Sequence, residues 1–230
     1  LSVSGNDLDV LLGGIQFVPL GTFEYYKQNG ELADKARGEF NEHGNDSWAY
    51  DQRGFDYITR DQLGYNYAIK DELFRTKDRD KYQRLIIKAA ANDNYPFAYG
   101  GSGAHIRDSY VQSLSQIADL RMDERSFEPW VMFLNGEYWG IYGIREKVDE
   151  EYIEANFGVD EDDVDLLNPW SALAGTTSDF VEAYVSLTSA EPQDDWYYDV
   201  LDAEFALQNY IDYFVIQTYI QNFNWMGIAW

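Results

Sequence analysis

The clearest hydrophobic pattern in the chain lies near its middle. The apolar run at 130–134, WVMFL, is long enough for one strand and too short for a helix. Asn135-Gly136 follows, a dipeptide that tolerates the positive φ required at both central positions of a type I′ turn. Aromatic and β-branched residues then recur over 138–144. The pattern predicts two antiparallel strands joined by a two-residue turn.

The hairpin should bury side chains from both of its strands. We expect Met132 or Phe133 from the first strand, and Trp139 or Ile141 from the second, to lie in the core. Two glycines interrupt the second strand, and glycines inside strands mark bulges or places of close packing. The hairpin is therefore expected to be the organising element of the chain.

A helix is predicted directly after the hairpin. Apolar residues recur at helical spacing over 148–157, Asp149 and Glu150 fall in the first turn, and Gly158 supplies a stop. Glu146 stands at the junction between strand and helix.

The first hundred residues predict a mostly antiparallel β unit. The expected strands are 15–20, 23–26, 55–59, 65–69 and 84–90. Residues 31–47 are polar with scattered glycines and predict a long connection.

The second half is predicted to be mainly helical. A helix near 106–120 should carry an apolar face, and a short strand is expected at 164–167. Further helices are expected at 179–187, 196–200 and 205–223. The last is the longest and apolar on most sides, which predicts burial.

Composition narrows the classes of function. The chain has 230 residues, 41 acidic and 17 basic, with a formal charge of −24. Such a surface repels nucleic acid and anionic lipid, so neither is expected as a main partner.

No apolar run approaches the length of a membrane span. The absence of cysteine excludes disulfides and thiolate chemistry. The first residues show neither a basic n-region nor a cleavage motif, so no signal peptide is expected in the given chain.

Several local patterns point only weakly to chemistry. Residues 99–103 are glycine-rich but lack the Gly-Lys-Ser/Thr of a phosphate-binding loop, which favours a plain connection. Glu42, His43 and Asp46 are close in sequence, but with two histidines in the chain a zinc site is not expected. Ser-His-Asp catalysis has no nucleophile-elbow motif. A carboxylate pair for glycoside hydrolysis stays open, because nothing in so acidic a chain selects the pair.

A resemblance to a known family appears in the hairpin and its helix. Residues 134–153 read LNGEYWGIYGIREKVDEEYI, which resembles the signature of the spore-coat-protein-H (CotH) kinase family. The resemblance implies an α+β, two-lobed protein-kinase-like fold within one domain over 1–230. A β-rich lobe would span 1–104, and the helix, hairpin and helical part would span 105–230. It also implies a secreted protein, extracellular or at the cell surface.

The resemblance also assigns roles to individual residues. Arg53 stands where the family has its nucleotide-binding lysine, and Glu146 matches the carboxylate that pairs with it. Arg107 matches the arginine that opens the family's helix, and should anchor the lobes by pairing with a carboxylate. Asn224 stands at the position of the catalytic aspartate. Asparagine cannot accept a proton at neutral pH, so this position is not expected to act as a base.

ATP and Mg²⁺ are the cofactors that the resemblance implies, with weak or no binding expected here. The family's later Asp-x-Asp metal motif has no counterpart before Trp230, so we expect a C-terminally incomplete domain without a metal site. The leading hypothesis is a secreted CotH-type kinase-like protein. The resemblance implies ATP-dependent phosphoryl transfer to a protein, with little or no catalysis expected from this chain. The alternative is a non-catalytic surface or adhesion module that binds a protein or glycan.

Overall fold

The computed structural model describes residues 1–5, 18–44, 50, 52–64, 66–93, 103–168, 171–189 and 191–222. The chain forms two compact units that interleave along the sequence. The first, called here the barrel unit, comprises Leu1–Tyr110 and Arg125–Lys147. The second, the helical unit, comprises Val111–Glu124 and Val148–Trp230.

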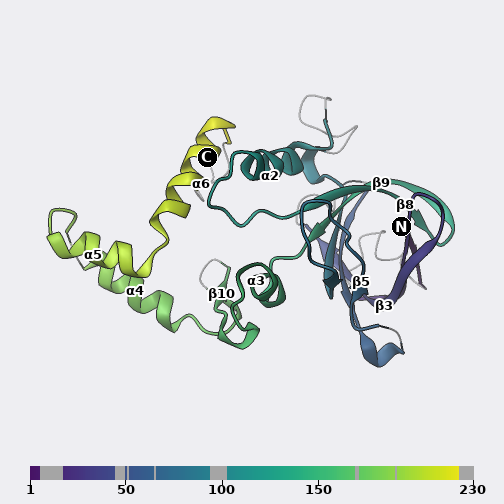
Figure 1. Ribbon diagram of the computed structural model, residues 1–230, viewed down its shortest axis with the longest axis horizontal. Helices are drawn as coiled ribbons and strands as arrows, with labels where there is room; N and C mark the ends of the chain where they lie inside the picture. Colours follow the sequence, from purple (N-terminus) through teal and green to yellow (C-terminus); the bar gives the residue numbers. More distant parts are fainter. Residues whose placement is uncertain are drawn as a thin grey trace. The chain divides into compact units, whose positions relative to one another are not determined.

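Seven strands of the barrel unit form one closed barrel in the order β1-β2-β3-β4-β7-β9-β8 (Figure 1). Their bounds are β1 Ser2–Ser4, β2 Leu20–Tyr26, β3 Leu32–His43, β4 Gly54–Thr59, β7 Arg84–Lys88, β8 Phe127–Leu134 and β9 Glu137–Glu146. A separate two-stranded sheet pairs β5 (Ile69–Lys70) with β6 (Lys81–Tyr82). Short 3₁₀ turns lie at Asp61–Leu63 and Ala91–Asp93.

The N-terminal strand closes the barrel. β1 pairs antiparallel with β2 and parallel with β8, with Val3 opposite Phe23 on one side and Leu134 on the other. The terminal amino group of Leu1 adds a hydrogen bond to the carbonyl of Val131. Because every strand edge is paired, the barrel leaves no open edge for another chain to join.

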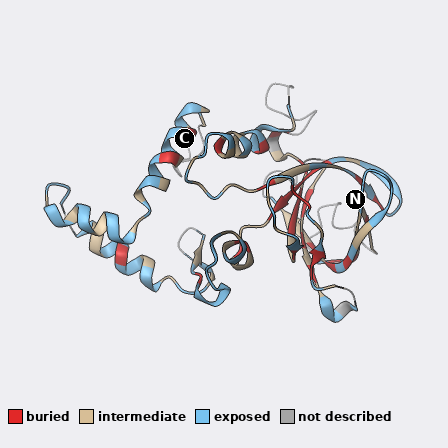
Figure 2. Ribbon diagram, in the orientation of Figure 1, coloured by how far each residue is buried: buried red, intermediate tan, exposed pale blue. Residues whose placement is uncertain are grey.

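The hydrophobic core fills the interior of this barrel, and Figure 2 shows many of the buried residues there. Aromatic side chains dominate it, and Phe23 stacks on Tyr57 with ring centroids 5.1 Å apart. The largest fully buried side chains include Phe23, Phe40, Phe55, Tyr57 and Tyr142. A full set of inward-facing side chains explains why a barrel of this size is a packed core and not a pore.

The central hairpin forms as predicted, with one correction to its burial. Asn135 and Gly136 have φ of 50° and 87°, as a type I′ turn requires. Met132 is fully buried, but Trp139 and Ile141 are exposed at 38% and 51%. The prediction that one of these two lies in the core was therefore wrong. A bulge between Met132 and Phe133 shifts the register of the strands, which alternation alone does not reveal.

Gly143 shows why the second strand of the hairpin needs a glycine. A Cβ atom placed there would lie 2.3 Å from the ring of Phe127 on β8. The aromatic ring therefore occupies the space that a side chain would need.

The predicted connection over 31–47 is wrong, because most of it forms β3, a strand of 12 residues. Its inward positions are filled by Ala36, Gly38 and Phe40, all buried. Two of these residues are too small to produce a hydrophobic signal, although they fit the crowded interior of a small barrel.

Other strand predictions have mixed outcomes. The strands at 55–59 and 84–90 are confirmed as β4 and β7. Of the strand predicted at 65–69, only Ile69 is in β5. Residues 18–19 precede β2 without being part of it, and 15–17 lie outside the described residues.

The helical unit contains short helices and one small sheet. The helices are α2 Arg107–Ile117, which begins in the barrel unit, α3 Glu150–Phe157, α4 Ser178–Thr188, α5 Asp195–Glu204 and α6 Leu207–Tyr219. β10 (Leu166–Leu167) pairs with β11 (Ala172–Ala174), and a 3₁₀ turn lies at Glu161–Asp163. The positions of these helices along the chain confirm the helical predictions.

Helix α3 ends at Gly158 as the sequence predicted, whereas Asp149, expected in its first turn, is the residue that precedes and caps it. The side chain of Asp149 accepts a hydrogen bond from the backbone N–H of Tyr152, which caps the first turn. Gly158 ends the helix with φ of 70°, in the left-handed region.

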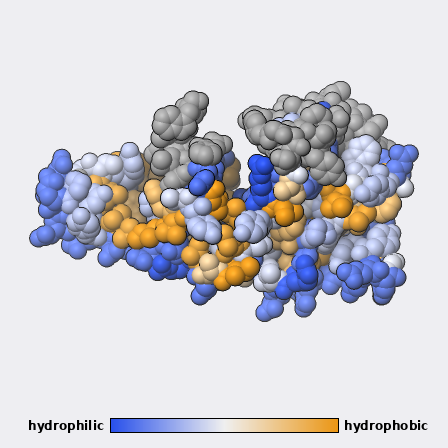
Figure 3. Space-filling view, turned by 90° about the horizontal axis from the view of Figure 1, so that it is seen from above, coloured by the Kyte–Doolittle hydropathy of each residue, from blue (hydrophilic) through white to orange (hydrophobic). Residues whose placement is uncertain are grey.

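The prediction that the last long helix is buried was wrong. Only Asp212 and Ile216 of α6 are buried, whereas Tyr210, Val215 and Tyr219 are exposed at 59%, 55% and 75%. The apolar face predicted near 106–120 is likewise exposed at Ile106, Tyr110 and Ile117. Figure 3 shows such hydrophobic side chains on the surface of the helical unit. Helical period alone does not tell whether a partner covers the apolar side.

The predicted two-lobed protein-kinase-like fold is contradicted. The N-terminal part is a closed seven-stranded barrel, and the described part of the chain adds five helices. The sequence predicted five of the seven barrel strands and missed β1 and β3. The pairing of β1 with β8 that closes the barrel joins residues some 130 positions apart. No helix among the described residues has the length and apolar character needed to cross a membrane.

Candidate functional site

Basic residues are concentrated in the barrel unit. Sixteen of the 17 lysine and arginine residues lie in this unit, although the whole chain is strongly acidic. Several of them project from the outer wall of β7 and β9, where inward positions are taken by the core. We call this part of the barrel surface the cationic wall. It is defined by Lys88, Arg145 and Lys147 together with His43, Asp56 and Asp108, which contact them.

One carboxylate joins two of these cations. Asp108, in the first turn of α2, accepts hydrogen bonds from Lys88 on β7 and from Arg145 on β9. Arg145 is almost fully buried, and its guanidinium also lies 5.5 Å from the ring centroid of Phe127. The side chain of Lys88 keeps 18% of its surface exposed. Of the two cations, Lys88 is therefore the one that can reach a ligand.

The pKa values of this group follow from burial and neighbouring charges. Burial would raise the pKa of Asp108, but the charges of Arg145 and Lys88 outweigh it and hold that pKa well below its usual range. Burial and the nearby charge of Arg145 lower the pKa of Lys88. An ammonium that is partly desolvated beside another cation is stabilised by an incoming anion.

A second carboxylate links two further basic groups. His43 Nδ1 lies 2.7 Å from Asp56 Oδ1, and Lys147 Nζ lies 2.7 Å from Asp56 Oδ2. Burial alone would raise the pKa of Asp56, but the contacts with His43 and Lys147 lower it overall. Each oxygen of this carboxylate thus lies beside a basic group.

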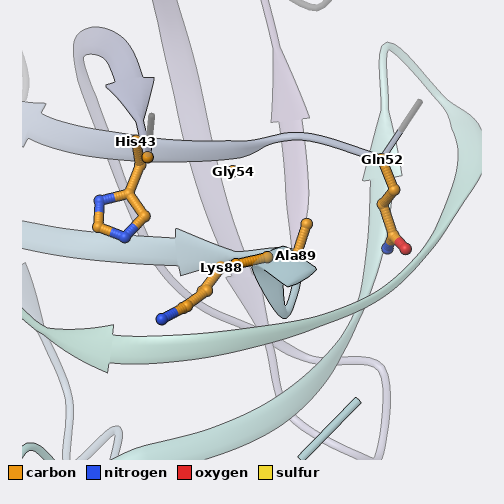
Figure 4. A pocket seen from close by; sticks show the side chains of 7 residues that line it. His43, Gln52, Gly54, Lys88 and Ala89 are labelled. Atoms are coloured by element: carbon orange, nitrogen blue, oxygen red, sulfur yellow. The ribbon is translucent and has the colours of Figure 1, made fainter. Parts of the chain in front are cut away.

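A small cavity of about 80 Å³ opens between the two groups. It is lined by His43, Gly44, Gln52, Gly54, Lys88, Ala89 and Ala91. Figure 4 shows His43 and Lys88 toward one end of the cavity and Gln52 toward the other. His43 ends β3 and Lys88 ends β7, and β4 lies between these two strands. Gln52 is held in place by a hydrogen bond to the carbonyl of Ile141. The lining combines a cation with glycine backbone, a combination suited to an anion of the size of one phosphate group.

The start of α2 is held against the barrel by a buried aspartate. Asp93 accepts hydrogen bonds from the backbone N–H groups of Ala104 and Arg107. The guanidinium of Arg107 also lies 3.1 Å from Asp93. This anchoring positions Asp108 over Lys88 and Arg145, so the geometry of the cationic wall depends on it.

Glu146, the carboxylate singled out by the sequence, is completely buried. It accepts a hydrogen bond from the backbone N–H of Ser126, and Arg79 and Lys77 lie 3.6 Å and 3.9 Å away. The residue therefore ties the end of β9 to the start of β8 and to the segment before β7.

The structure places Arg53 at the other end of the same strands. Arg53 directly precedes β4 and lies between Gln52 and Gly54, which both line the cavity. Glu146 pairs with Leu85, and Leu85 pairs with Tyr57, four residues along β4 from Arg53. Four residues of a strand span about 13 Å. The barrel therefore brings Arg53 near the cavity of Lys88, and brings Glu146 to Lys77 and Arg79.

The resemblance also assigned roles to Arg107 and Asn224. Arg107 lies at the start of α2 and contacts a carboxylate, Asp93, within the barrel unit. Asn224 lies outside the described residues, as do Asp46 and most of the glycine-rich stretch at 99–103. The part of the chain that is described contains no group of three or more histidine, aspartate or glutamate side chains placed to hold a metal ion.

The sequence reasoning missed the residues that make up the cationic wall. Arg145 and Lys147 flank the recognised Glu146, and Lys88 ends a strongly apolar strand, so each stood beside a feature that was noticed. Alternation along β4 and β7 could have assigned Asp56 and Lys88 to the outer face. Their meeting with Asp108 depends on how α2 packs, for which no local signal exists.

The family comparison agrees with the signature in the hairpin. Residues 40–227 match the family described as CotH kinase protein, and this range includes the whole cationic wall. The chain belongs to the CotH kinase protein family, which supports a kinase-like function. Among curated proteins, no sequence matches the chain.

Proposed function

We propose that this chain binds a nucleoside triphosphate through its phosphates at the cationic wall, as the binding step of a kinase-like activity. The observation that carries the proposal is the position of Lys88, which lines a small cavity while Arg145 and Asp108 fix its surroundings. Membership of the CotH kinase protein family supports the same assignment.

Electrostatics favours this place for a phosphate over the rest of the surface. The chain carries a charge of −24, so most of its surface repels a polyphosphate. Lys88, Arg145 and Lys147 face only Asp56 and Asp108 within the cationic wall, which leaves a local excess of positive charge. An anion would therefore be drawn to this wall and excluded elsewhere.

Different residues would contact the phosphate and position the residue that contacts it. Lys88 would contact a phosphate oxygen directly, and the backbone at Gly44 and Gly54 allows close approach. Arg145 is too buried to touch the ligand, so it acts as a positioning residue through Asp108. Arg53, between two residues of the cavity lining, supplies a further cation close by.

The described residues fit the phosphates of ATP, while Mg²⁺ has no three-ligand group among them. Mg²⁺ bridging the phosphates would neutralise charge that builds up during transfer. The proposal therefore concerns cations of this chain that bind phosphate, and it assigns no step of transfer to the described residues.

The test is isothermal titration calorimetry with ATP, with and without Mg²⁺. The Lys88→Gln variant should bind ATP about tenfold or more weakly, because it loses a hydrogen bond between charged groups. Lys81→Gln is the matched control, because it removes the same charge from an exposed position of the same unit. Equal affinity in the two variants, or no binding by the parent chain, would exclude the cationic wall as a nucleotide site. The surface or adhesion module would then be the better hypothesis.

Transfer of phosphate is expected to be slow because of Asn224. This residue stands at the family's aspartate position and cannot take a proton from an acceptor hydroxyl at neutral pH. A general base contributes roughly 10²–10⁴-fold, so Asn224→Asp should raise the labelling rate with radioactive ATP and Mg²⁺ or Mn²⁺. Rapid labelling by the parent chain that is lost in Asn224→Ala would contradict this account of the residue.

A further inference from the structure

A second cavity, of about 210 Å³, lies on the outer wall of the barrel. It is lined by Asn41, Asp56, Tyr57, Ile58, Arg84, Leu85 and Lys147. Sheet register explains this grouping, because Asn41 pairs with Asp56 across β3 and β4, and Ile58 pairs with Arg84 across β4 and β7. Directly opposite residues in such pairs have Cβ atoms about 5 Å apart. None of the lining residues except Lys147 and Asp56 takes part in the cationic wall.

The polar groups around this cavity are mainly donors. Asn41 contributes its amide, Arg84 its guanidinium and Lys147 its ammonium group. The single carboxylate, Asp56, already has one oxygen 2.7 Å from Lys147 and the other 2.7 Å from His43. A ligand that completes this site must therefore bring acceptor atoms.

Asn41 independently indicates that an acceptor is missing at this cavity. Its Nδ2 atom is buried and has no hydrogen-bond partner among the residues that the structure describes. Buried polar groups in proteins are nearly always paired, so a buried amide donor beside a cavity calls for an acceptor there.

Charge selects the kind of acceptor. Arg84, Lys147 and Asp56 together give the lining one net positive charge, which a single carboxylate neutralises. A carboxylate also matches the planar donor fork of arginine, whereas a polyphosphate would bring several charges to a site with one. At about 30 Å³ per water molecule, the cavity is large enough for a carboxylate on a short aliphatic stem.

We propose that Asn41, Arg84 and Lys147 form a carboxylate-binding site next to the cationic wall, which takes a short acidic group such as a glutamate side chain or a free dicarboxylate. This site shares Lys147 and Asp56 with the cationic wall, but Lys88, which is proposed to contact the phosphate, does not line it.

The probe for the test is glutarate, titrated into the full chain at constant ionic strength set with sodium chloride. The side-chain NH₂ of Asn41 is followed by ¹⁵N–¹H NMR, which reports on this atom alone. Glutarate should shift these resonances saturably, and chloride alone should not. An acetylated and amidated Gly-Glu-Gly peptide forms a second arm. Tighter binding of the peptide indicates a partner protein's side chain, and tighter binding of glutarate indicates a free acid.

Three variants make the result decisive. Asn41→Leu and Arg84→Gln should each weaken glutarate binding by about tenfold or more, since each removes a donor to a charged group. Arg37→Gln, an exposed residue on the same strand as Asn41, is the matched control and should bind normally. Thermal unfolding without ligand verifies that the variants are folded.

The proposal is overturned if glutarate produces no saturable shift at Asn41 in the millimolar range, or if the donor variants bind like the control. It is also overturned if Asn41→Leu abolishes ATP binding, because the cavity would then belong to the nucleotide site. Lys88→Gln is expected to bind glutarate with unchanged affinity. ATP titration of Lys88→Gln therefore tests the nucleotide proposal, and glutarate titration tests the carboxylate proposal independently of it.

Discussion

The barrel unit and the helical unit differ sharply in charge. The barrel unit contains 16 basic and 20 acidic residues, so its formal charge is −4. The helical unit contains one basic residue, Arg121, and 21 acidic residues, so its formal charge is −20. Nearly all of the acidity of the chain therefore resides in the helical unit. An anionic ligand is therefore repelled much more strongly by the helical unit than by the barrel unit.

The two units differ equally in how they bury apolar side chains. Every member of the main hydrophobic cluster lies in the barrel unit. The described part of the helical unit buries only Tyr152, Val164, Ala183 and Ile216 among its hydrophobic residues. The barrel unit therefore has a hydrophobic core of its own to stabilise it, whereas the described part of the helical unit buries few apolar side chains.

The first prediction tests the difference in cores and carries the largest effect on stability. Phe40→Ala should lower the free energy of unfolding by about 3–5 kcal/mol, since it removes a fully buried ring from the barrel. Phe214→Ala in α6 is the matched change at a position exposed at 38%, and should cost less than about 1 kcal/mol. Urea unfolding measures both. Similar losses would mean that the two units share one stabilising core.

The second prediction concerns the buried charge of the barrel. Glu146→Gln keeps an acceptor for the N–H of Ser126 but removes the charge that faces Lys77 and Arg79. We expect a loss of about 1–3 kcal/mol, because a hydrogen-bonded buried carboxylate is replaced by a neutral group. The exposed Glu137→Gln at the hairpin turn should change stability by at most about 0.5 kcal/mol. If Glu146→Gln loses no more stability than Glu137→Gln, the charge of Glu146 contributes no more to stability than that of an exposed glutamate.

The third prediction concerns the one basic residue of the helical unit. Arg121 donates to both oxygens of Asp212 on α6, at 2.8–3.0 Å, and lowers the pKa of this aspartate to about 2. A lowered folded pKa stabilises the folded state above the unfolded pKa of about 3.9. That stabilisation is lost as the pH falls from about 4 toward 2. In Arg121→Gln, NMR titration of the Asp212 carboxyl should show the pKa returning toward its ordinary value.

If the pKa of Asp212 stays near 2 without Arg121, another part of the helical unit must hold the charge, and the contact between Arg121 and α6 would not be the source of the shift.

The last prediction has the smallest effect and concerns the uneven charge itself. Raising NaCl from about 0.1 M to about 1 M shortens the Debye length from about 10 Å to about 3 Å. Screening should slow hydrogen exchange in the helical unit, where like charges repel, more than in the barrel unit. Equal changes in the two units would show that self-repulsion does not limit the stability of the helical unit.

Local elements were predictable to the extent that their signals are local. The Asn135-Gly136 turn and the stop at Gly158 were predicted correctly, because each depends on the backbone preference of one or two residues. The family was also recognisable from residues 134–153. Strand β3 was missed because Ala36 and Gly38 fill the barrel interior without producing a hydrophobic period.

The candidate site was predictable only in part. Arg53 and Glu146 were selected by resemblance, and the register now places them at opposite ends of the same strands. Lys88, Asp108 and Arg145 were not selected, although the structure joins them through one carboxylate.

The sequence by itself determined the acidity of the chain, the hairpin with its turn, the helix caps and the family to which the chain belongs. Each of these follows from composition or from residues within one turn or strand of each other. Only the tertiary structure decided that β1 pairs with β8 to close a barrel, and that His43, Asp56, Lys88, Asp108, Arg145 and Lys147 meet on its outer wall. Closure of the barrel and clustering of these charged residues depend on strand register and on the packing of α2. Both bring together residues that are far apart in the sequence. Hydrophobic period specifies which face of a strand is buried, but not which distant strand will lie beside it.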